Sequence, residues 1–146
     1  ALPNTAMITT IDQGEEGDIH PRNKKIVGQR LALAARRVAY GETIEYAAPA
    51  YTGMTTEGAA IRLRFSGVGT GLTSHGETLQ EFVIAGRERA FVRANARLDG
   101  NTVIVWHPDV PEPVAVRYAW ANNPDRANLF NNEGLPVAPF RTDAWQ

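Results

Sequence analysis

The chain begins with a short apolar and β-branched stretch, followed by a polar loop and a helical pattern. Residues 5–12, TAMITTID, favour a strand because threonine and isoleucine dominate and the turn-forming sequence QGEEGD follows. From residue 23 to residue 40, apolar residues recur every three or four positions, which predicts an amphipathic helix. The expected apolar face comprises Val27, Leu31, Ala34, Ala35 and Val38.

Residues at both ends of this pattern are typical of helix termini. Pro21 suits the first turn of a helix, and Gly41 stands where a left-handed C-terminal cap is expected. The opposite face is basic, and we expect it to be in contact with water. Its residues are Lys24, Lys25, Arg30, Arg36 and Arg37.

After Gly41 the pattern changes to the alternation typical of strands. Residues 42–58 have no sustained period and are expected to be a link. In residues 59–65, AAIRLRF, apolar side chains alternate with Arg62 and Arg64, which places the two kinds on opposite faces. Further short strands are expected at residues 81–86, 89–98, 101–107 and 114–120. Together they predict an antiparallel β-sandwich or jelly-roll-like module from about Glu57 to Trp120.

The C-terminal tail has no regular period but retains large apolar side chains. We expect an irregular segment that packs these side chains against the rest of the module. They are Leu129, Phe130, Leu135, Phe140 and Trp145.

Composition narrows the classes of function. A net charge of −1 argues against nucleic acid as the main partner, because such proteins carry a basic surface. No apolar run approaches the roughly 20 residues that cross a bilayer, so no membrane span is expected. The chain has no cysteine, which excludes disulfides and thiolate chemistry. We expect a periplasmic or secreted location.

His20 follows Asp18 by two residues in the loop before the helix. The two are candidates for the general base and its orienting acid in a serine hydrolase. In the alternative, structural interpretation, Asp18 begins an Asx turn and His20 caps the helix. The nucleophile is the difficulty, since Ser66 and Ser74 are the only serines. Ser74 precedes His75 directly, and neighbours on an extended backbone point opposite ways, so they make a poor dyad.

Other possible sites are weaker. The glycine-rich residues 66–76 lack the Gly-Lys-Ser/Thr ending of a phosphate loop, so a hairpin loop is expected. His20, His75 and His107 lack the close spacing of a zinc site. No metal or cofactor is therefore expected. A group of arginines is expected to form a solvated or interface-facing strand edge, namely Arg87, Arg89, Arg93 and Arg97.

Two long blocks resemble a known family. Residues 4–41 contain Ile-Asp-x-Gly, Asp-Ile-His-Pro, Asn-Lys and the helical sequence GQRLALA, and residues 114–145 contain VRYAW, NLFN and GLPVAPFRTD. Blocks of this kind, in this order, resemble the C-terminal portion of the sialate O-acetylesterase group of SGNH hydrolases.

This resemblance implies a fold of α/β plus β. Residues 1–41 would be the last strand, loop and helix of an SGNH (flavodoxin-like) hydrolase domain, and residues 42–146 an accessory β-sandwich with an irregular tail. The family's nucleophilic serine lies in a Gly-Gln-Ser-like block near the start of its catalytic domain. The implied partner is therefore an N-terminal SGNH segment of the same protein.

The resemblance also implies a reaction. His20 would be the general base of an esterase that removes acetyl groups from O-acetylated carbohydrates, such as 9-O-acetylated sialic acid or an acetylated plant polysaccharide. The general SGNH pattern Asp-x-x-His would place an acid at Gly17, so either Asp18 or a backbone carbonyl would orient the imidazole.

Two rival interpretations come from other classes of protein. In the first, the chain is a non-catalytic carbohydrate-binding module that stacks sugars on Trp106, Tyr118 and Trp120. In the second, it is a structural domain in which His20 is inert. A binding module has no evident use for the strand-loop-histidine-helix unit in the first forty residues, and this unit distinguishes the interpretations.

Overall fold

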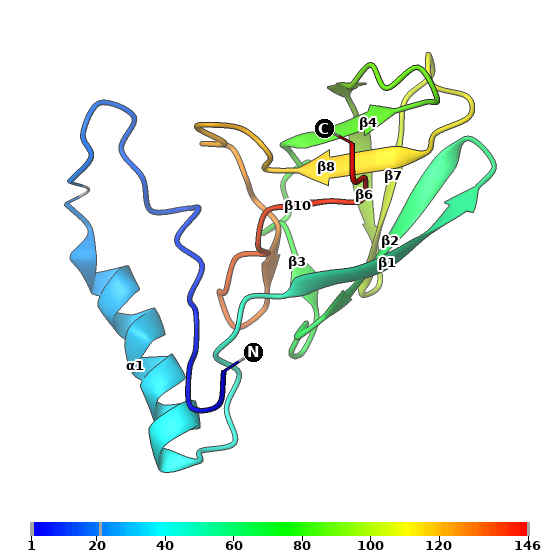
Figure 1. Ribbon diagram of the computed structural model, residues 1–146. Helices are drawn as coiled ribbons and strands as arrows, with labels where there is room; N and C mark the ends of the chain where they lie inside the picture. Colours follow the sequence, from blue (N-terminus) through cyan, green and yellow to red (C-terminus); the bar gives the residue numbers. More distant parts are fainter. Residues whose placement is uncertain (1, 21, 146) are drawn as a thin grey trace.

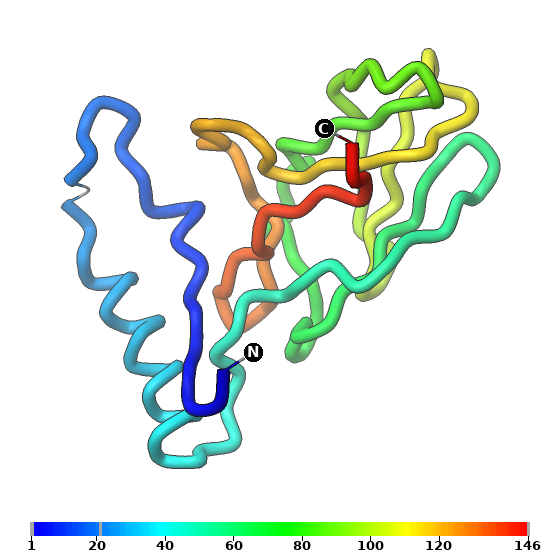
Figure 2. The backbone as a smooth tube through the Cα atoms, in the orientation of Figure 1, coloured from blue at the N-terminus to red at the C-terminus, as the bar shows by residue number. Residues whose placement is uncertain are grey.

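The computed structural model describes residues 2–20 and 22–145 and is mostly β, with one helix and antiparallel sheets. Helix α1 (Lys24–Tyr40) stands to one side of the β module, and the N-terminal segment runs between them (Figures 1 and 2). No helix in the described part of the chain is long and apolar enough to cross a membrane.

The first sheet of the β module has four antiparallel strands in the order β1-β2-β7-β6. Its strands are β1 (Ala50–Glu57), β2 (Ala60–Ser66), β6 (Asn95–Asp99) and β7 (Thr102–Trp106). Strands β6 and β7 are joined by a tight turn at Asp99-Gly100, in which Gly100 adopts a φ of 58°. Glycine suits this turn because left-handed backbone is nearly free of strain only without a Cβ atom.

The second sheet, in the order β10-β8-β4-β5, is also antiparallel. A separate two-stranded pair, β3-β9, lies nearer to α1 (Figure 1). The strands of these two sheets are β3 (Leu72–Thr73), β4 (Phe82–Ala85), β5 (Val92–Arg93), β8 (Ala115–Tyr118), β9 (Phe130–Asn131) and β10 (Phe140–Arg141).

Both four-stranded sheets contribute to one hydrophobic core. Ile61 and Leu63 of β2 are fully buried while Arg62 and Arg64 remain more accessible, as the alternation predicts. Phe82 and Tyr118 of the second sheet pack with ring centroids 4.7 Å apart. The predicted strands at 59–65, 81–86, 101–107 and 114–120 therefore correspond to β2, β4, β7 and β8.

Three predicted elements differ in the structure of this chain. Residues 5–12 are not a strand, because they find no neighbouring strand within the described residues with which to form a ladder. Residues 42–58 are not merely a link, since Ala50–Glu57 forms β1. Residues 89–98 form two strands, because the chain leaves the second sheet after β5 and joins the first as β6.

The predicted helix is confirmed, but its buried face differs from the prediction. Gly41 forms the left-handed C-cap, with a φ of 71°. Ala34 is buried as expected, whereas Leu31 is 54% exposed. Arg30, predicted to be on the wet side, is only 5% exposed because it is paired with an acidic side chain. Pro21, the predicted first-turn residue, lies outside the described residues.

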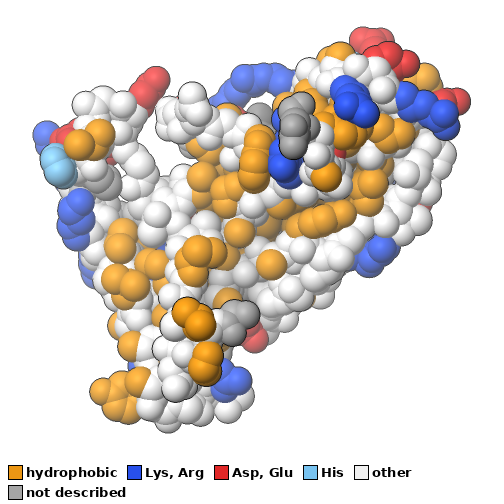
Figure 3. All heavy atoms as spheres, viewed as in Figure 1, with side chains coloured by type: hydrophobic (Ala, Val, Ile, Leu, Met, Phe, Trp, Pro, Cys, Tyr) orange, Lys and Arg blue, Asp and Glu red, His pale blue; other side chains and the backbone are white. Residues whose placement is uncertain are grey.

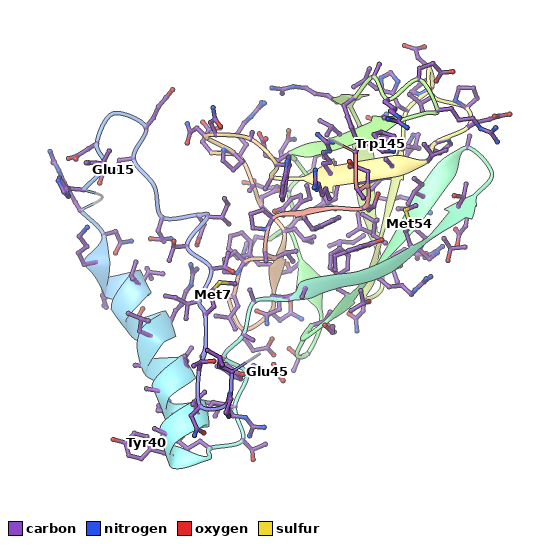
Figure 4. All side chains as sticks on the ribbon, in the orientation of Figure 1. Met7, Glu15, Tyr40, Glu45, Met54 and Trp145 are labelled. Carbon is purple, nitrogen blue, oxygen red and sulfur yellow. The ribbon has the colours of Figure 1, made fainter. Side chains whose placement is uncertain are left out.

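The tail packs its apolar side chains as predicted. Leu129 and Leu135 are buried, and Phe140 stacks on Tyr51 with ring centroids 4.9 Å apart. Trp145, labelled near β8 in Figure 4, lies 5.7 Å from the ring of Phe91. The tail thus joins the core of the β module through β9 and β10.

One core hydrogen bond should be measurable by itself. The buried hydroxyl of Tyr118 accepts a hydrogen bond from the backbone N–H of Leu129 at 3.0 Å, and burial raises the Tyr118 pKa to about 12. Tyr118→Phe leaves this N–H without its acceptor, so the free energy of unfolding should fall by about 1–3 kcal/mol in urea denaturation. Tyr40→Phe, at a side chain 78% exposed, is the control and should change it by less than about 0.5 kcal/mol.

Candidate functional site

The loop that carries His20, residues 12–23, is called here the histidine loop. Within it, Oδ1 of Asp18 accepts a hydrogen bond from the backbone N–H of His20 at 2.8 Å. This contact is the Asx-type turn foreseen in the structural interpretation. His20 itself does not cap the helix, because Asn23 occupies the N-cap position.

A second carboxylate folds the histidine loop back on itself. Oε1 of Glu15 accepts a hydrogen bond from the backbone N–H of Arg22 at 2.7 Å. The backbone N–H of Asp18 donates to the carbonyl oxygen of Glu15 at 3.1 Å. Glu15 lies toward the far end of the loop in Figure 4. The backbone on both sides of His20 is therefore held by side-chain carboxylates of the same loop.

The base of the loop is fixed by an ion pair that the sequence analysis missed. Arg30 of α1 donates from Nη1 and Nη2 to the two carboxylate oxygens of Asp12, at 2.6 and 2.7 Å. The side chains are only 6% and 14% exposed. Arg30 also donates to the carbonyl oxygens of Thr9, at 2.9 Å, and Gly134, at 3.4 Å. One guanidinium thus joins the N-terminal segment, the helix and the tail.

Asp12 remains a carboxylate in this setting. Burial raises its pKa, but the hydrogen bonds from Arg30 and Gln13 and the positive charge of Arg30 outweigh that effect, so the pKa is lowered overall. Gln13 donates to Asp12 at 2.9 Å and accepts from the side-chain amide of Asn23 at 2.9 Å. This chain of contacts ties the start of the histidine loop to its end.

The predicted catalytic pair lies at the surface. Both Asp18 and His20 are exposed, and the hydrogen bond recorded for the Asp18 side chain goes to the His20 backbone rather than to the imidazole. The geometry therefore gives His20 a defined backbone and an accessible side chain. An imidazole presented in this way can accept a proton from a group that approaches from outside the chain.

The side chains of Ser74 and His107 make local hydrogen bonds. Ser74 is buried and its hydroxyl donates to the carbonyl oxygen of Glu77 at 2.6 Å, so it does not pair with His75. Nδ1 of His107 accepts from the backbone N–H of Asp109 at 3.2 Å. Within residues 2–20 and 22–145, no three acidic, histidine or cysteine side chains are grouped so as to hold a metal ion.

The proposed sugar platform of the rival interpretation is not assembled. Tyr118 is 1% exposed and belongs to the core. Trp120 is half-exposed, but the guanidinium of Arg141 lies over its ring, 5.4 Å from the centroid. The arginines at 87, 89, 93 and 97 are exposed as expected, but they do not form one strand edge. Arg87 and Arg89 lie in the loop between β4 and β5, and Arg93 and Arg97 lie in strands of different sheets.

Two adjoining grooves separate the histidine loop from residues 122–125, which follow β8. One, of about 210 Å³, is lined by Ile11, Asp12, Gly14, Glu16, Asn123 and Asp125. The other, of about 500 Å³, shares Ile11, Gly14 and Asn123 and extends to Asn122 and Pro139. Figure 3 shows a notch in the surface between the left-hand lobe and the body of the molecule.

The chain is similar to two sialate O-acetylesterases and to a carbohydrate acetylesterase of known structure. It is 28% identical to sialate O-acetylesterase of Mus musculus over 152 aligned residues, which cover 95% of this chain and 28% of the mouse protein. A shorter match, 49% identical over 45 residues, covers 28% of this chain and 8% of the sialate O-acetylesterase of Rattus norvegicus. No protein-family model matches the chain.

A solved structure is more similar. The crystal structure of a carbohydrate acetylesterase from Xanthomonas citri superposes with a TM-score of 0.90 and 50% identity, covering 94% of this chain and 32% of that one. The resemblance to sialate O-acetylesterases inferred from the sequence blocks is confirmed. The chain spans about a third or less of the length of these relatives.

The sequence contained a signal for the missed ion pair. Arg30 is three residues after Val27 and four before Ala34, so it shares the apolar face of the helix rather than the basic one. A charged residue at such a position is rarely buried without a partner. Asp12, at the end of the preceding segment, was the available carboxylate.

The ion pair predicts a specific loss of stability. Asp12→Asn leaves the buried guanidinium of Arg30 without its counter-charge, so the free energy of opening α1 should fall by about 3–5 kcal/mol, or by the whole local stability if that is smaller. Hydrogen exchange of the α1 amides measures it. The control is Glu42→Gln, which breaks an exposed pair with Arg36 and should change it by at most about 1 kcal/mol.

The same pair has a defined pH dependence. Because the pKa of Asp12 is lowered in the folded chain, its contribution is fully present above the unfolded value of about 3.9 and is lost as the pH falls through the folded value. The difference in α1 protection between wild type and Asp12→Asn should therefore shrink between pH 6 and pH 3. A difference that stays constant over this range would contradict the assignment.

Proposed function

We propose that this chain forms the C-terminal part of a serine carbohydrate O-acetylesterase and supplies its catalytic base, His20. The observation that carries the proposal is the exposed imidazole on a loop whose backbone is held at both sides of His20 by Asp18 and Glu15. The similarity to acetylesterases over nearly the whole chain supports the same reaction class.

The proposed reaction is acyl transfer. A serine from an N-terminal SGNH segment of the same protein attacks the acetyl carbonyl, and His20 accepts the serine proton as general base. The imidazolium then protonates the sugar oxygen as it leaves. In the second half, water attacks the acetyl-serine while His20 accepts a proton from it, and His20 then returns a proton to the serine oxygen as acetate is released. Donors on the N-terminal segment stabilise the oxyanion. No metal or cofactor takes part in these steps.

Asp18 has a positioning role in this proposal. Its carboxylate bonds to the His20 backbone, so it sets the direction in which the imidazole leaves the loop. In the complete site, the imidazole N–H that faces away from the serine is bonded either by Asp18, after a change of rotamer, or by a backbone carbonyl. The two arrangements differ in how much activity depends on the Asp18 carboxylate.

The N-terminal SGNH segment has a surface on which to dock. Large apolar side chains are unusually exposed on the arm formed by the first forty-one residues, including Ile19 at 90%, Met7 at 82% and Leu31 at 54%. Figure 3 shows apolar side chains over this side of the molecule, and Figure 4 shows Met7 on the segment beside α1. The relatives are about three times as long as this chain, and we propose that the additional part of such a polypeptide covers these exposed apolar side chains.

We therefore propose two structural units. Residues 1–41 complete the hydrolase domain with its last strand, loop and helix, and residues 5–12 become a strand when the hydrolase sheet provides a neighbour. Residues 42–146 form an accessory β-sandwich, supported by the two four-stranded sheets around one core. We also propose a periplasmic or secreted location, where acetylated polysaccharides are met.

Replacing the base tests the proposal. In the complete polypeptide, His20→Ala should lower kcat for an acetyl ester by about 10³-fold, because general-base catalysis contributes about 10²–10⁴. His75→Ala and His107→Ala are matched controls and should keep kcat within about twofold. Circular dichroism establishes that each variant is folded. If His20→Ala retains more than about a tenth of wild-type kcat, His20 is inert and the structural interpretation replaces this one.

The Asp18→Ala variant separates the two ways of orienting His20. A loss of only about 10-fold is expected if a backbone carbonyl shares the orienting role, within the scale of acid–base effects. A loss as large as that of His20→Ala would instead assign the imidazole contact to the Asp18 carboxylate.

The 146-residue chain by itself should lack esterase activity. Ser74 is buried and its hydroxyl is bonded to a backbone carbonyl, and Ser66 lies at the end of β2. Within residues 2–20 and 22–145, neither hydroxyl is hydrogen-bonded to a histidine that could act as its base. Hydrolysis of an acetylated sugar by the purified chain should equal that of its His20→Ala variant. A rate that depends on His20 in the isolated chain would contradict an external nucleophile.

A further inference from the structure

We propose that Glu15 is a positioning residue for His20. Its side chain and its backbone carbonyl hold the histidine loop before and after His20, and these two contacts are called here the Glu15 clasp. The proposal rests on the function proposed above. It adds a role in catalysis for Glu15, which acts on the rate through the position of the base and does not itself touch the substrate.

The Glu15 clasp reaches backbone groups on both sides of His20. The carbonyl oxygen of Glu15 accepts from the N–H of Asp18, two residues before His20, and its carboxylate accepts from the N–H of Arg22, two residues after it. Glu15 and Asp18 also form an antiparallel bridge, so the chain turns back on itself at this point. One residue therefore fixes where the segment that carries His20 begins and where it ends.

The contact with Arg22 is charge-assisted. Oε1 of Glu15 lies 2.7 Å from the amide nitrogen of Arg22. Hydrogen bonds to an ionised acceptor are shorter and about twice as strong as those between neutral groups. The carbonyl oxygen of Arg22 in turn accepts from the backbone N–H of Lys24, the first residue of α1, at 2.9 Å. The Glu15 clasp thus connects the first half of the histidine loop to the start of the helix.

The other contacts across the histidine loop act at its base. Gln13 and Asn23 close the base through their side-chain amides, at 2.9 Å. Beyond that contact, the bond from Arg22 to Glu15 is the one hydrogen bond within residues 2–20 and 22–145 that joins the chain before His20 to the chain after it. Without this bond, the flank after His20 is free to move relative to the flank before it.

Catalysis by His20 depends on the direction of its backbone. His20 and its neighbour Ile19 are both exposed, so packing within this chain does not hold the imidazole. A general base must lie within hydrogen-bond reach of the proton that it accepts. A displacement of about 1 Å can lower the rate about 10²-fold. The Glu15 clasp should therefore raise kcat by limiting the positions that the imidazole can adopt.

The test measures kcat and KM of the complete polypeptide on an acetylated sugar. Loss of one hydrogen bond to a charged group changes the population of a conformation about 10-fold or more, so Glu15→Ala should lower kcat about 10-fold. KM should stay within about twofold, since no substrate contact is removed. Glu15→Gln keeps an oxygen that can accept from the Arg22 N–H and should restore kcat to within about threefold of wild type.

A matched control and a double variant isolate the effect on His20. Glu16→Ala removes the adjacent, exposed carboxylate and should leave kcat within about twofold of wild type. In a His20→Ala background, Glu15→Ala should not lower the residual kcat further, because residues that act as a unit are not additive. A general loss of structure would lower kcat by the same factor in both backgrounds. Hydrogen exchange of the α1 amides should match wild type in each variant.

The outcomes separate this proposal from the function on which it rests. If His20→Ala is inactive but Glu15→Ala behaves as Glu16→Ala does, the positioning role is wrong and the esterase stands. The role is also overturned if Glu15→Gln loses as much kcat as Glu15→Ala, or if the loss persists in the His20→Ala background. If His20→Ala retains wild-type activity, the proposed function fails and the role of Glu15 fails with it.

Discussion

The histidine loop depends on the buried ion pair between Arg30 and Asp12. A guanidinium that is almost fully buried must be paired, and here it meets a carboxylate through two parallel hydrogen bonds. Its remaining donors reach carbonyl oxygens before the loop and in the tail. A lysine could not make these contacts together, because an ammonium group lacks the planar fork. The loop begins at Asp12, one partner of this pair, and ends about two turns of helix before Arg30, the other partner.

The Arg30–Asp12 pair also connects the histidine loop to the β module. Gly134, which accepts from Arg30, lies three residues after the end of β9, and Ile11, next to Asp12, packs against the hydrophobic core of the β module. The base of the loop that carries His20 is therefore connected to the β module as well as to α1.

Local patterns predicted what local forces decide. The period of α1 and the alternation in β2 could be recognised because burial of one face leaves a repeat in the sequence. The glycine cap of α1 and the apolar, β-branched composition of β7 and β8 were equally local signals. Strand β1 could not be recognised from the sequence, since its TGMTT segment shows little apolar alternation. It is a strand because it pairs with β2, and that pairing leaves no periodic pattern in its own residues. Residues 5–12 have strand-forming composition but no neighbouring strand within the described residues.

The candidate site divides in the same way. His20 and Asp18 were found from a motif, and the Asx turn from the chemistry of aspartate before a turn. Arg30 was assigned to the wrong face because charge alone was weighed, whereas its position three residues after Val27 already placed it on the buried side. Asn123 and its neighbours carry no local signal, because a groove between two distant segments exists only after folding.

The central claim is that His20 serves a serine from elsewhere in the same protein. The most direct measurement is a structure of the complete polypeptide with an acetyl-ester mimic bound. We predict that an imidazole nitrogen of His20 lies about 2.6–3.2 Å from a serine Oγ, the distance at which a base accepts its proton. If the reactive serine is instead paired with a different base and the His20 side chain points to solvent, the account of this loop is contradicted.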